Sequence, residues 1–431
     1  MARQSLSYLL YNILLTVAGI FFWPYFIIRN LLLKRPISPY FYNMPPDFLR
    51  QIGAKPVIWV QAVSVGETVV ANCIVNQIRK MLPDYQVVFT TTTPTGQAMA
   101  KKLLGDTTPI TYFPFDFPFF VKRFVKRIKP RLFIMIETEI WPNAIRYCRQ
   151  SGAKVVMVNG RISDRSYGRY LKVASFLKTV LEQIELFAMQ SAEDANRIGT
   201  LGAPLEKIVV AGNAKFDQDY PSFAPEQLVS FRRQYHWQAE IPIFTAASTH
   251  QGEEELILQA YQELLKERPY YLILAPRHPD RAEAVSTLLT ATGLPFARRT
   301  AGAVESEPRI LLLDTFGELS LVYALAEVIF VGGSLTNIGG HNVLEAAVQS
   351  KPVIYGPFMH AQREMKELLE SVDAGFTVKD AAELTRMIRE LTADRALYRK
   401  RGLAARQAVL ANQGTAENTV RLLAALIRGD S

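Results

Sequence analysis

Two glutamates stand where carboxylates can handle protons or developing charge. Glu67 ends the run Gln61-Ala62-Val63-Ser64-Val65-Gly66-Glu67, after an apolar stretch and at the start of a helical pattern. A carboxylate there is a general base if partial burial raises its pKa; alternatively, it complements the dipole of its helix. Glu137 begins the run Glu137-Thr138-Glu139-Ile140-Trp141-Pro142-Asn143. Two carboxylates so close to an apolar stretch are not explained by solubility, and Glu137, nearer to that stretch, is the better functional candidate.

Basic residues occupy comparable positions farther along the chain. Lys215 lies in Gly212-Asn213-Ala214-Lys215-Phe216-Asp217, and the run Pro276-Arg277-His278-Pro279 follows another apolar stretch. An arginine in such a loop forms charge-assisted hydrogen bonds to phosphate, although Arg277 or His278 can equally pair with a neighbouring acid. These residues are therefore candidates for binding an anionic group.

A glycine-rich loop follows the apolar run 328–331. It reads Gly332-Gly333-Ser334-Leu335-Thr336-Asn337-Ile338-Gly339-Gly340-His341-Asn342-Val343-Leu344-Glu345. Paired glycines allow a ligand to approach the backbone, and free N–H groups at a helix start bind phosphate. Asn342 and Glu345 share one helix face, where the carboxylate can accept hydrogen bonds from ribose hydroxyls. The fingerprints of dinucleotide-binding and Walker-type loops are absent from the sequence.

No metal site is predicted. The histidines, which lack the spacing of metal ligands, are His236, His250, His278, His341 and His360. Asp217-Gln218-Asp219 matches a short acidic pattern of metal-dependent glycosyltransferases, but no strand precedes it, so we interpret the match as chance. The two cysteines, Cys73 and Cys148, are too few for a disulfide scaffold.

These loops require strands to position them. Short apolar runs alternate with helical patterns, which predicts parallel sheets built from strand–helix–strand units with ligands bound at the carboxyl ends of the strands. The predicted strands are Val57–Val60, Gln86–Thr91, Ile110–Phe113, Leu132–Ile136, Lys154–Val158, Leu186–Met189, Ile208–Val210, Ile243–Ala246, Tyr271–Leu274, Ile310–Leu313, Val328–Val331 and Pro352–Tyr355. We predict an α/β protein of two doubly wound domains facing a cleft. Asp217–Glu240 is the predicted linker, and a long helical tract, Asp380–Arg428, ends the chain.

The first 36 residues predict a membrane anchor. Ser5–Ile28 contains no charged residue, and about 20 apolar residues suffice to span a bilayer. A cleaved signal peptide is disfavoured because no small-residue cleavage site follows Pro24. An interfacial helix, bent at Pro24 with Trp23 and Tyr25 among the headgroups, remains an alternative. Arg29, Lys34 and Arg35 follow the stretch and only Arg3 precedes it, which places the rest of the chain in the cytoplasm.

The overall charge indicates an anionic partner. The 431 residues have a net charge of +9, with 49% hydrophobic and 21% charged residues, which excludes a disordered chain. Four basic residues stand at helical spacing between apolar ones: Lys122, Arg123, Lys126 and Arg127. They form either the solvated face of a core helix or a basic amphipathic surface that rests on anionic lipid.

Taken together, the loops resemble those of the 3-deoxy-D-manno-octulosonic acid (Kdo) transferases of Gram-negative lipopolysaccharide synthesis. The matching stretches are Ser64-Val65-Gly66-Glu67, Thr90-Thr91-Thr92-Thr93-Pro94-Thr95-Gly96, Glu137-Thr138-Glu139-Ile140-Trp141-Pro142-Asn143, Lys215-Phe216-Asp217, Ser248-Thr249-His250, Pro276-Arg277-His278-Pro279, Gly317-Glu318-Leu319, Gly332-Gly333-Ser334 and Gly339-Gly340-His341-Asn342. They extend from the anchor to about Gly356.

This resemblance implies a GT-B fold and an inverting transfer of Kdo from CMP-Kdo to the lipid A precursor, lipid IVA, without a metal or other cofactor. It implies that Glu67 is the general base and that Glu137 and Lys215 stabilise the transition state. The implied CMP contacts are Pro276, Arg277, Phe316, Gly317, Glu318, Asn342, Val343, Leu344 and Glu345. The implied supporting residues are Ser64, Gly66, Ser248, His278, Gly333 and Ser334.

The resemblance also assigns the regions of the chain. Residues 1–36 form the anchor, 37–220 the domain for the lipid acceptor, and 221–431 the domain for the CMP-sugar, on the cytoplasmic face of the inner membrane. Two other classes fit parts of the sequence. A non-hydrolysing sugar-nucleotide epimerase shares the layout but needs no anchor, and a nucleic-acid binder lacks the aromatic stacking platforms expected among the basic residues.

Overall fold

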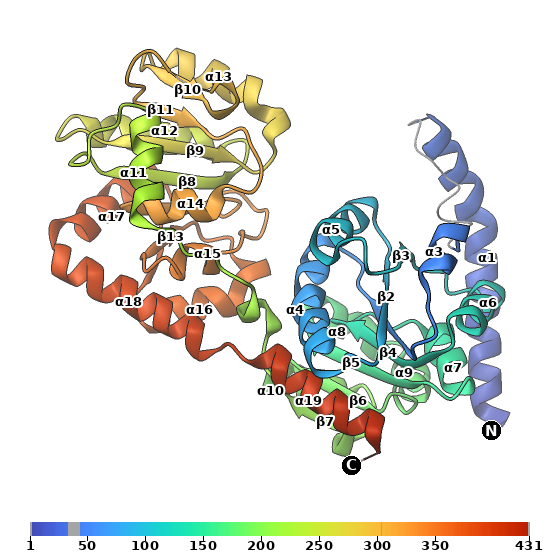
Figure 1. Ribbon diagram of the computed structural model, residues 1–431. Coiled ribbons are helices and arrows are strands. Elements are labelled where there is room, and N and C mark those ends of the chain that lie inside the picture. The colour runs from blue at the N-terminus through green and yellow to red at the C-terminus, as the bar shows by residue number, and fades with distance from the viewer. Residues whose placement is uncertain (1, 33–43, 303, 430–431) are drawn as a thin grey trace. The chain divides into compact units, whose positions relative to one another are not determined.

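The computed structural model describes residues 2–32, 44–302 and 304–429. The chain forms two compact units (Figure 1): unit 1 comprises Met1–Gln218 and Asn412–Ser431, and unit 2 comprises Asp219–Ala411. Lys34 and Arg35 of the predicted basic flank lie outside the described residues, as do the side chains of Arg3 and Trp23.

Unit 1 contains a parallel sheet in the order β3-β2-β1-β4-β5-β6-β7. Its strands are β1 (Val57–Gln61), β2 (Gln86–Thr91), β3 (Ile110–Tyr112), β4 (Pro130–Ile136), β5 (Lys154–Gly160), β6 (Leu186–Met189) and β7 (Ile208–Val210). Its helices are α1 (Ala2–Leu32), α3 (Pro46–Gln51), α4 (Val65–Met81), α5 (Pro94–Leu104), α6 (Pro118–Ile128), α7 (Pro142–Gln150), α8 (Asp164–Leu171), α9 (Ala174–Leu181), α10 (Ala192–Thr200) and α19 (Thr415–Arg428), with the 3₁₀ turns η1 (Leu205–Lys207) and η2 (Ala214–Asp217).

Unit 2 contains a second parallel sheet, in the order β10-β11-β9-β8-β12-β13-β14. Its strands are β8 (Ile243–Thr249), β9 (Tyr271–Pro276), β10 (Phe296–Arg298), β11 (Ile310–Leu312), β12 (Val328–Val331), β13 (Val353–Tyr355) and β14 (Gly375–Thr377). Its helices are α11 (Pro225–Gln234), α12 (Glu253–Leu265), α13 (Ala282–Ala291), α14 (Leu319–Leu325), α15 (Leu344–Ala347), α16 (Arg363–Ser371), α17 (Ala381–Ala393) and α18 (Arg395–Ala411), with the 3₁₀ turns η3 (Pro279–Arg281), η4 (Arg299–Ala301) and η5 (His360–Gln362).

The central strands β1 and β8 are buried along their whole length because helices cover both faces of each sheet. In β1, Trp59 belongs to one core cluster with residues of α6 and α7, whereas Ile58 and Val60 belong to another with residues of α4 and α19. All five residues of β1 are buried. The strands are all parallel, so the loops that follow them emerge together at the carboxyl ends of the strands. The predicted α/β fold with two doubly wound sheets is confirmed.

Several boundaries differ from the prediction. The edge strands β10 and β14 were not predicted, and the expected linker contains helix α11, whose Phe231 is buried beside Tyr235 and Trp237. The expected helical tract Asp380–Arg428 consists of the three helices α17, α18 and α19.

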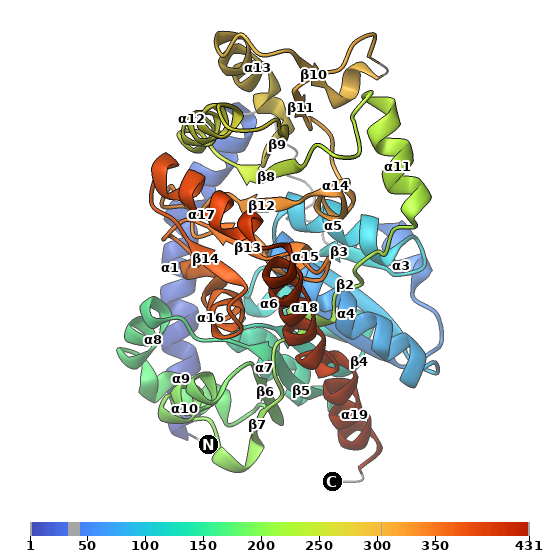
Figure 2. The same ribbon diagram turned by 90° about the vertical axis from the view of Figure 1, so that its left-hand side faces the viewer.

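The last helix, α19, belongs to unit 1, although the predicted second domain ran to residue 431. Asp217 accepts hydrogen bonds from the backbone N–H groups of Gly414 and Ala416, each at 2.5 Å. Lys154 donates to the carbonyl oxygen of Leu426. The helix packs against α4 (Figure 2), and this burial attaches it to unit 1.

Helix α1 lies along the side of unit 1 that contains α6 and α7 (Figure 1). It includes the stretch Leu6–Arg29, whose mean hydropathy of 1.7 and length of 24 residues are sufficient, by composition and length only, to cross a membrane. Leu10, Leu14 and Phe21 are among its many exposed apolar side chains. Tyr8 is buried, and its hydroxyl donates to the carbonyl oxygen of Pro142 at 3.2 Å.

Candidate active site

Glu67 lies at the beginning of α4, where its carboxylate is fixed by the preceding loop. Val63 donates its backbone N–H to Glu67 Oε2 at 2.6 Å, and the Ser64 hydroxyl donates to Oε1 at 2.9 Å. Ser64 is also the N-cap residue and accepts from the backbone N–H of Glu67. This reciprocal capping box satisfies donors at the helix start and orients the carboxylate. A Cβ added at Gly66 would meet no atom within 4 Å.

The surroundings of Glu67 favour a proton-accepting role. Burial raises the pKa of Glu67, and the negative charge of Glu137 raises it further, whereas the hydrogen bonds from Val63 and Ser64 oppose the shift. The side chain nevertheless remains partly accessible. The helix-capping role and a proton-accepting role are therefore compatible in one residue.

Glu137 follows β4 in a constrained backbone conformation. Its φ is 58°, in the left-handed region that non-glycine residues rarely adopt, and its N–H donates to the carbonyl oxygen of Val158 at 2.9 Å. Its Oε1 lies 3.8 Å from Lys215 Nζ, in an ion pair of two mostly covered side chains. Backbone strain at this position is consistent with a functional requirement on the direction of the chain.

Lys215 is positioned by a buried polar network under η2. The backbone N–H of Lys215 donates to Asn213 Oδ1 at 3.0 Å, and that of Ala214 donates to Asn159 Oδ1 at 2.8 Å. Gln190 joins the two asparagines by bonding the carbonyl oxygen of Asn159 and the side chain of Asn213. Three strand ends therefore cooperate to place one lysine beside Glu137.

Glu139 is a further candidate, which the sequence interpretation ranked below Glu137. Burial raises the pKa of Glu139 to about 8, and the negative charges of Glu67 and Glu137 contribute. Helix α7 begins only at Pro142, so Glu139 lies in the loop. The close spacing of Glu137 and Glu139 was the available signal. The structure thus brings together three carboxylates and one lysine.

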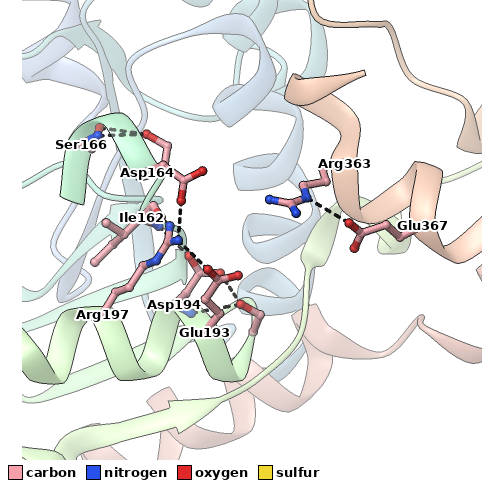
Figure 3. A network of polar contacts seen from close by, with 10 residues as sticks. Ile162, Asp164, Ser166, Glu193, Asp194, Arg197, Arg363 and Glu367 are labelled. Atoms are coloured by element: carbon pink, nitrogen blue, oxygen red, sulfur yellow. Dashed lines mark hydrogen bonds and ion pairs between the residues drawn. The ribbon is translucent and has the colours of Figure 1, made fainter. Parts of the chain in front are cut away.

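The loop after β5 is held by salt bridges and not by the catalytic candidates (Figure 3). Arg197 of α10 pairs with Asp164 and Glu193 and donates to the carbonyl oxygen of Ile162. Asp194 accepts the backbone N–H of Ile162 at 2.7 Å. The polar character of this loop therefore has a structural explanation.

In unit 2, the glycine-rich loop after β12 is held by a buried glutamate. The backbone N–H groups of Gly333, Ser334 and Leu335 donate to the carboxylate of Glu253 at 2.7, 2.9 and 2.8 Å. Buried N–H groups require partners, and Glu253 supplies them for this part of the loop.

The same loop is packed too tightly for side chains at two of its glycines. A Cβ at Gly332 would lie 2.6 Å from the carbonyl oxygen of Ser248. A Cβ at Gly333 would lie 2.8 Å from the ring of His341. Ser334 joins neighbouring loops, because its hydroxyl donates to the carbonyl oxygen of Val331 and accepts from the backbone N–H of Gly356. Gly333 and Ser334 therefore support the loop structurally.

Three histidines meet at the carboxyl ends of the strands, a cluster that no sequence spacing indicated. His250 Nε2 lies 2.8 Å from His341 Nε2, and the two rings stack at 5.1 Å. His278 contacts His250 edge to face at 5.7 Å. Burial lowers the pKa of His341 to about 4, and the positive charge of Arg277 contributes. Ser248, in the strand before this cluster, has a φ of 57°.

Arg277 is exposed just after Pro276, the last residue of β9. Other arginines of unit 2 form ion pairs with acids: Arg281 pairs with buried Glu254, and Arg299 pairs with Glu318. Within the described parts of the chain, Arg277 forms no such ion pair. Its charge is therefore available to an anionic ligand.

Asn342 and Glu345 are neighbours, as their spacing predicts. Asn342 Nδ2 donates to Glu345 Oε1 at 3.2 Å, and Asn342 Oδ1 accepts the backbone N–H of Leu344 at 3.0 Å. The expected free N–H at Leu344 is thus already bonded, in a helix of only four residues. Burial raises the pKa of Glu345, while Asn342 and Arg277 oppose the shift. Val343 and Leu344 are buried.

Glu318 belongs to a separate network. Arg299 Nη2 donates to Glu318 Oε1 at 2.7 Å, and the Thr315 hydroxyl also donates to the carboxylate. These bonds lower the pKa of Glu318. Phe316 is 73% exposed and Gly317 has a φ of 87°, so the turn presents an aromatic ring to solvent.

Helix α6 is amphipathic, as predicted. Val121, Phe124 and Ile128 are buried in the core of unit 1. The exposed basic residues are Lys122, Arg123, Lys126 and Arg127. The basic surface continues around a hollow of about 800 Å³ whose cationic lining residues are Lys55, Lys126, Arg127, Lys129 and Arg131. Across the described ranges, none of these five side chains forms a salt bridge.

The described residues contain no group of three or more His, Cys, Asp or Glu side chains placed to hold a metal ion. The carboxylates and lysine of unit 1 are suited to proton transfer and electrostatic stabilisation, and the exposed arginine of unit 2 is suited to binding an anion.

Known proteins resemble this chain in fold and in sequence. A glycosyltransferase from Rickettsia africae matches with a TM-score of 0.61 over 88% of this chain and 100% of that chain, at 16% identity. A UDP-GlcNAc 2-epimerase from Neisseria meningitidis matches with a TM-score of 0.57 over 85% and 99%, at 13% identity. These likenesses show a fold of the GT-B type, which transferases and epimerases share.

Sequence similarity distinguishes a transferase from an epimerase for this chain. The family model for 3-deoxy-D-manno-octulosonic-acid transferase (kdotransferase) matches residues 42–218. A 3-deoxy-D-manno-octulosonic acid transferase of Haemophilus influenzae is 36% identical over 369 residues, which cover 85% of this chain and 86% of that protein. The chain therefore belongs to the Kdo transferase family, as the resemblance of its loops predicted.

Proposed function

We propose that this Kdo transferase uses CMP-Kdo as donor and lipid IVA, the lipid A precursor, as acceptor, with inversion at the anomeric carbon. Membership of the Kdo transferase family supports the assignment of Kdo as the sugar that is transferred. The observation on which the chemistry rests is the carboxylate of Glu67, which Ser64 and Val63 hold in place and whose pKa is raised by burial. A raised pKa makes a carboxylate a better proton acceptor at neutral pH.

In the proposed step, the acceptor hydroxyl oxygen attacks the anomeric carbon of Kdo while its proton passes to Glu67. The bond between that carbon and the phosphate oxygen of CMP breaks, and its electron pair leaves with CMP. A single displacement assisted by one base inverts the configuration. Each carboxylate oxygen of Glu67 already accepts one hydrogen bond, but an ionised carboxylate has about four acceptor positions, so capacity for the hydroxyl remains.

Glu137 and Lys215 are the proposed transition-state stabilisers. The sugar ring gains positive charge as the bond to CMP lengthens, and a preorganised carboxylate stabilises such charge. Lys215, 3.8 Å from Glu137, offsets the repulsion among the carboxylates before substrate binds. The buried network under η2 and the constrained backbone at Glu137 fix this pair in advance.

Unit 2 is the proposed site for CMP. Arg277, which is exposed and not salt-bridged within the described ranges, supplies positive charge for the departing phosphate. The further proposed contacts are Pro276, Phe316, Gly317, Glu318, Asn342, Val343, Leu344 and Glu345. Glu345 is the proposed acceptor for ribose hydroxyls, because Asn342 orients its carboxylate.

The proposed location is the cytoplasmic face of the inner membrane, with α1 as the single N-terminal anchor. The apolar side chains exposed on α1 and the basic residues exposed on α6 support association with an anionic lipid surface. The acceptor is itself a phosphorylated lipid, so the same basic surface is suited to its headgroup.

The test is transfer from CMP-Kdo to lipid IVA by the purified full-length protein, followed by mass spectrometry. Glu67→Ala should reduce the rate of transfer by at least about 100-fold. The Kd for CMP, measured by calorimetry, should stay within about twofold of the wild-type value, because Glu67 lies in unit 1 and the proposed CMP site in unit 2. Glu226→Ala, at an exposed first-turn position of α11, is the control. No transfer by the wild type, or full turnover by Glu67→Ala, would contradict the proposal.

A further inference from the structure

Buried hydrogen bonds join the first helix to the loop that contains the catalytic candidates. Asp116, between β3 and α6, is 4% exposed. Its Oδ2 accepts from the Tyr11 hydroxyl of α1 and from the backbone N–H of Asn143, each at 2.9 Å. Its Oδ1 accepts from the backbone N–H of Ala144 at 2.9 Å. One carboxylate therefore links α1 to the first turn of α7.

The side chain of Asn143 strengthens the same junction. Its Nδ2 donates to Asn12 Oδ1 of α1 at 2.7 Å and to the carbonyl oxygen of Asp116 at 2.5 Å. Tyr8 adds a bond to the carbonyl oxygen of Pro142 at 3.2 Å. Tyr8 and Asn12 of α1 thus bond directly to the start of α7, and Tyr11 bonds to it through Asp116.

Helix α7 depends on these contacts because it has no cap of its own. The residue at its N-cap position is Trp141, which makes no capping hydrogen bond, and the first N–H groups of a helix need partners from outside it. Asp116 provides two of them. Burial raises the pKa of Asp116 to about 7, and the bonds from Asn143, Ala144 and Tyr11 favour its charged form.

The start of α7 is also the end of the loop that contains Glu137 and Glu139. This loop leaves β4 through the left-handed backbone conformation of Glu137, and it reaches α7 five residues later, at Pro142. With so short a connection, a displacement of the first turn of α7 is transmitted to both carboxylates.

We propose that Tyr11 and Asn12 are positioning residues for the transfer reaction: through Asp116 and Asn143, helix α1 holds the Glu137–Glu139 loop in its catalytic arrangement. This inference rests on the proposed function, because it takes the loop to act in the transfer step. A helix that served only as a membrane tether would affect membrane binding. A helix that holds the loop affects turnover where no bilayer is present.

The test uses full-length protein in detergent micelles with CMP-Kdo and lipid IVA. Tyr11→Phe removes only the hydroxyl, and Asn12→Ala removes the amide. Each should lower kcat by about 5- to 20-fold and leave the KM for CMP-Kdo within about twofold, since unit 2 is untouched. Leu14→Ala, on the exposed side of α1, is the matched control and should retain the wild-type kcat.

Hydrogen exchange of peptides covering Pro142–Gln150 provides a second measurement that needs no substrate. Exchange should be at least about fivefold faster in Tyr11→Phe than in the wild type and unchanged in Leu14→Ala. Faster exchange alongside a wild type that transfers no Kdo would reject the proposed function but keep the structural role of α1. Wild-type kcat and exchange in both α1 variants, or equal losses in Leu14→Ala, would overturn the inference.

Discussion

Each unit contains a glutamate at the same place, and the two glutamates have different surroundings. Gly66-Glu67 follows the first strand of unit 1, and Gly252-Glu253 follows the first strand of unit 2. Both carboxylates accept a hydrogen bond from a backbone N–H of the preceding loop, at 2.6 and 2.9 Å. Glu253 is fully buried and accepts three more from the loop after β12, whereas Glu67 remains partly accessible.

The difference shows that position in the fold does not determine what a carboxylate does. Glu253 accepts four hydrogen bonds from backbone N–H groups, three of them from the loop after β12, so its carboxylate holds that loop in place. Glu67 has fewer such bonds and a pKa raised by burial, so it retains affinity for a proton. Exchanging each glutamate for glutamine should therefore separate catalysis from stability.

The largest expected effect is on turnover. Glu67→Gln preserves the size of the side chain and an acceptor for the Val63 N–H, but it removes the base, so kcat should fall by about 1000-fold. Thermal unfolding should change little. A kcat within about tenfold of the wild type would place the general base elsewhere.

The matching change in unit 2 should affect stability. Glu253→Gln removes a buried charge that accepts four backbone N–H bonds, so the free energy of unfolding should fall by about 3 kcal/mol. Urea denaturation of the full-length protein measures the change. Unchanged stability would mean that the loop after β12 does not depend on this carboxylate.

A third comparison concerns arginines within unit 2. Arg277→Ala should raise the Kd for CMP by about 10- to 30-fold because a charge-assisted bond to phosphate is lost. The control is Arg386→Ala, an exposed residue of α17 paired with Glu390. Calorimetry measures both, and equal affinity in the Arg277 variant would remove that residue from the phosphate site.

Glu139 of unit 1 and Glu318 of unit 2 respond to pH in opposite ways. Burial, together with Glu67 and Glu137, raises the pKa of Glu139 to about 8 from an ordinary 4.5. The stability that Glu139 contributes is therefore fully present below about pH 4.5 and is lost as pH rises toward 8. Over this range the free energy of unfolding should fall by at most about 1.4 kcal/mol per pH unit. Glu139→Gln should remove this slope and be more stable than the wild type at pH 8.

Glu318 in unit 2 provides the contrast. The hydrogen bonds from Arg299 lower its pKa, so its contribution is present above its ordinary pKa and lost as pH falls through the lowered value. Chemical denaturation between about pH 2 and pH 9 tests both residues, because the transition of Glu318 lies below its ordinary pKa. If the slope of the wild type persists in Glu139→Gln, another group is responsible for it.

The smallest expected effect is on lipid binding. Lys126→Ala on α6 should weaken binding to vesicles with anionic lipid by about fivefold, or about 1 kcal/mol, and the loss should shrink as salt is added. Lys400→Ala, exposed on α18 of unit 2, is the control. Binding that is indifferent to Lys126 and to salt would favour a basic face that is merely solvated.

Much of the fold could be predicted because its central strands are continuous apolar runs. The runs that became β1 and β4 also placed Glu67 and Glu137 correctly at strand ends. Strands β10 (Phe296–Arg298) and β14 (Gly375–Thr377) escaped prediction because each contains only one large apolar residue. The equally short edge strands β3 and β7 were predicted because they are richer in apolar and β-branched residues.

Contacts between loops that are distant in sequence could not be predicted, and they limited how much of the candidate site the sequence revealed. His250, His278 and His341 lie on three separate loops, so only the pairing of the strands brings them together. The occupation of the Gly333 and Ser334 N–H groups by Glu253, 80 and 81 residues away in sequence, was likewise beyond any local pattern. The capacity of a loop to bind an anion depends on which donors the fold leaves unbonded, and spacing does not reveal this.

The placement of α19 has a consequence for how the molecule is made. Unit 1 is discontinuous, since all of Asp219–Ala411 is synthesised between its main part and its last helix. Until α19 emerges from the ribosome, the core cluster that contains Ile58 and Val60 lacks Val420 and Leu423 of that helix. Asp217 likewise lacks the backbone N–H groups of Gly414 and Ala416, which donate hydrogen bonds to it in the folded protein. Unit 2 can therefore complete its folding during translation before unit 1, although unit 1 is begun first.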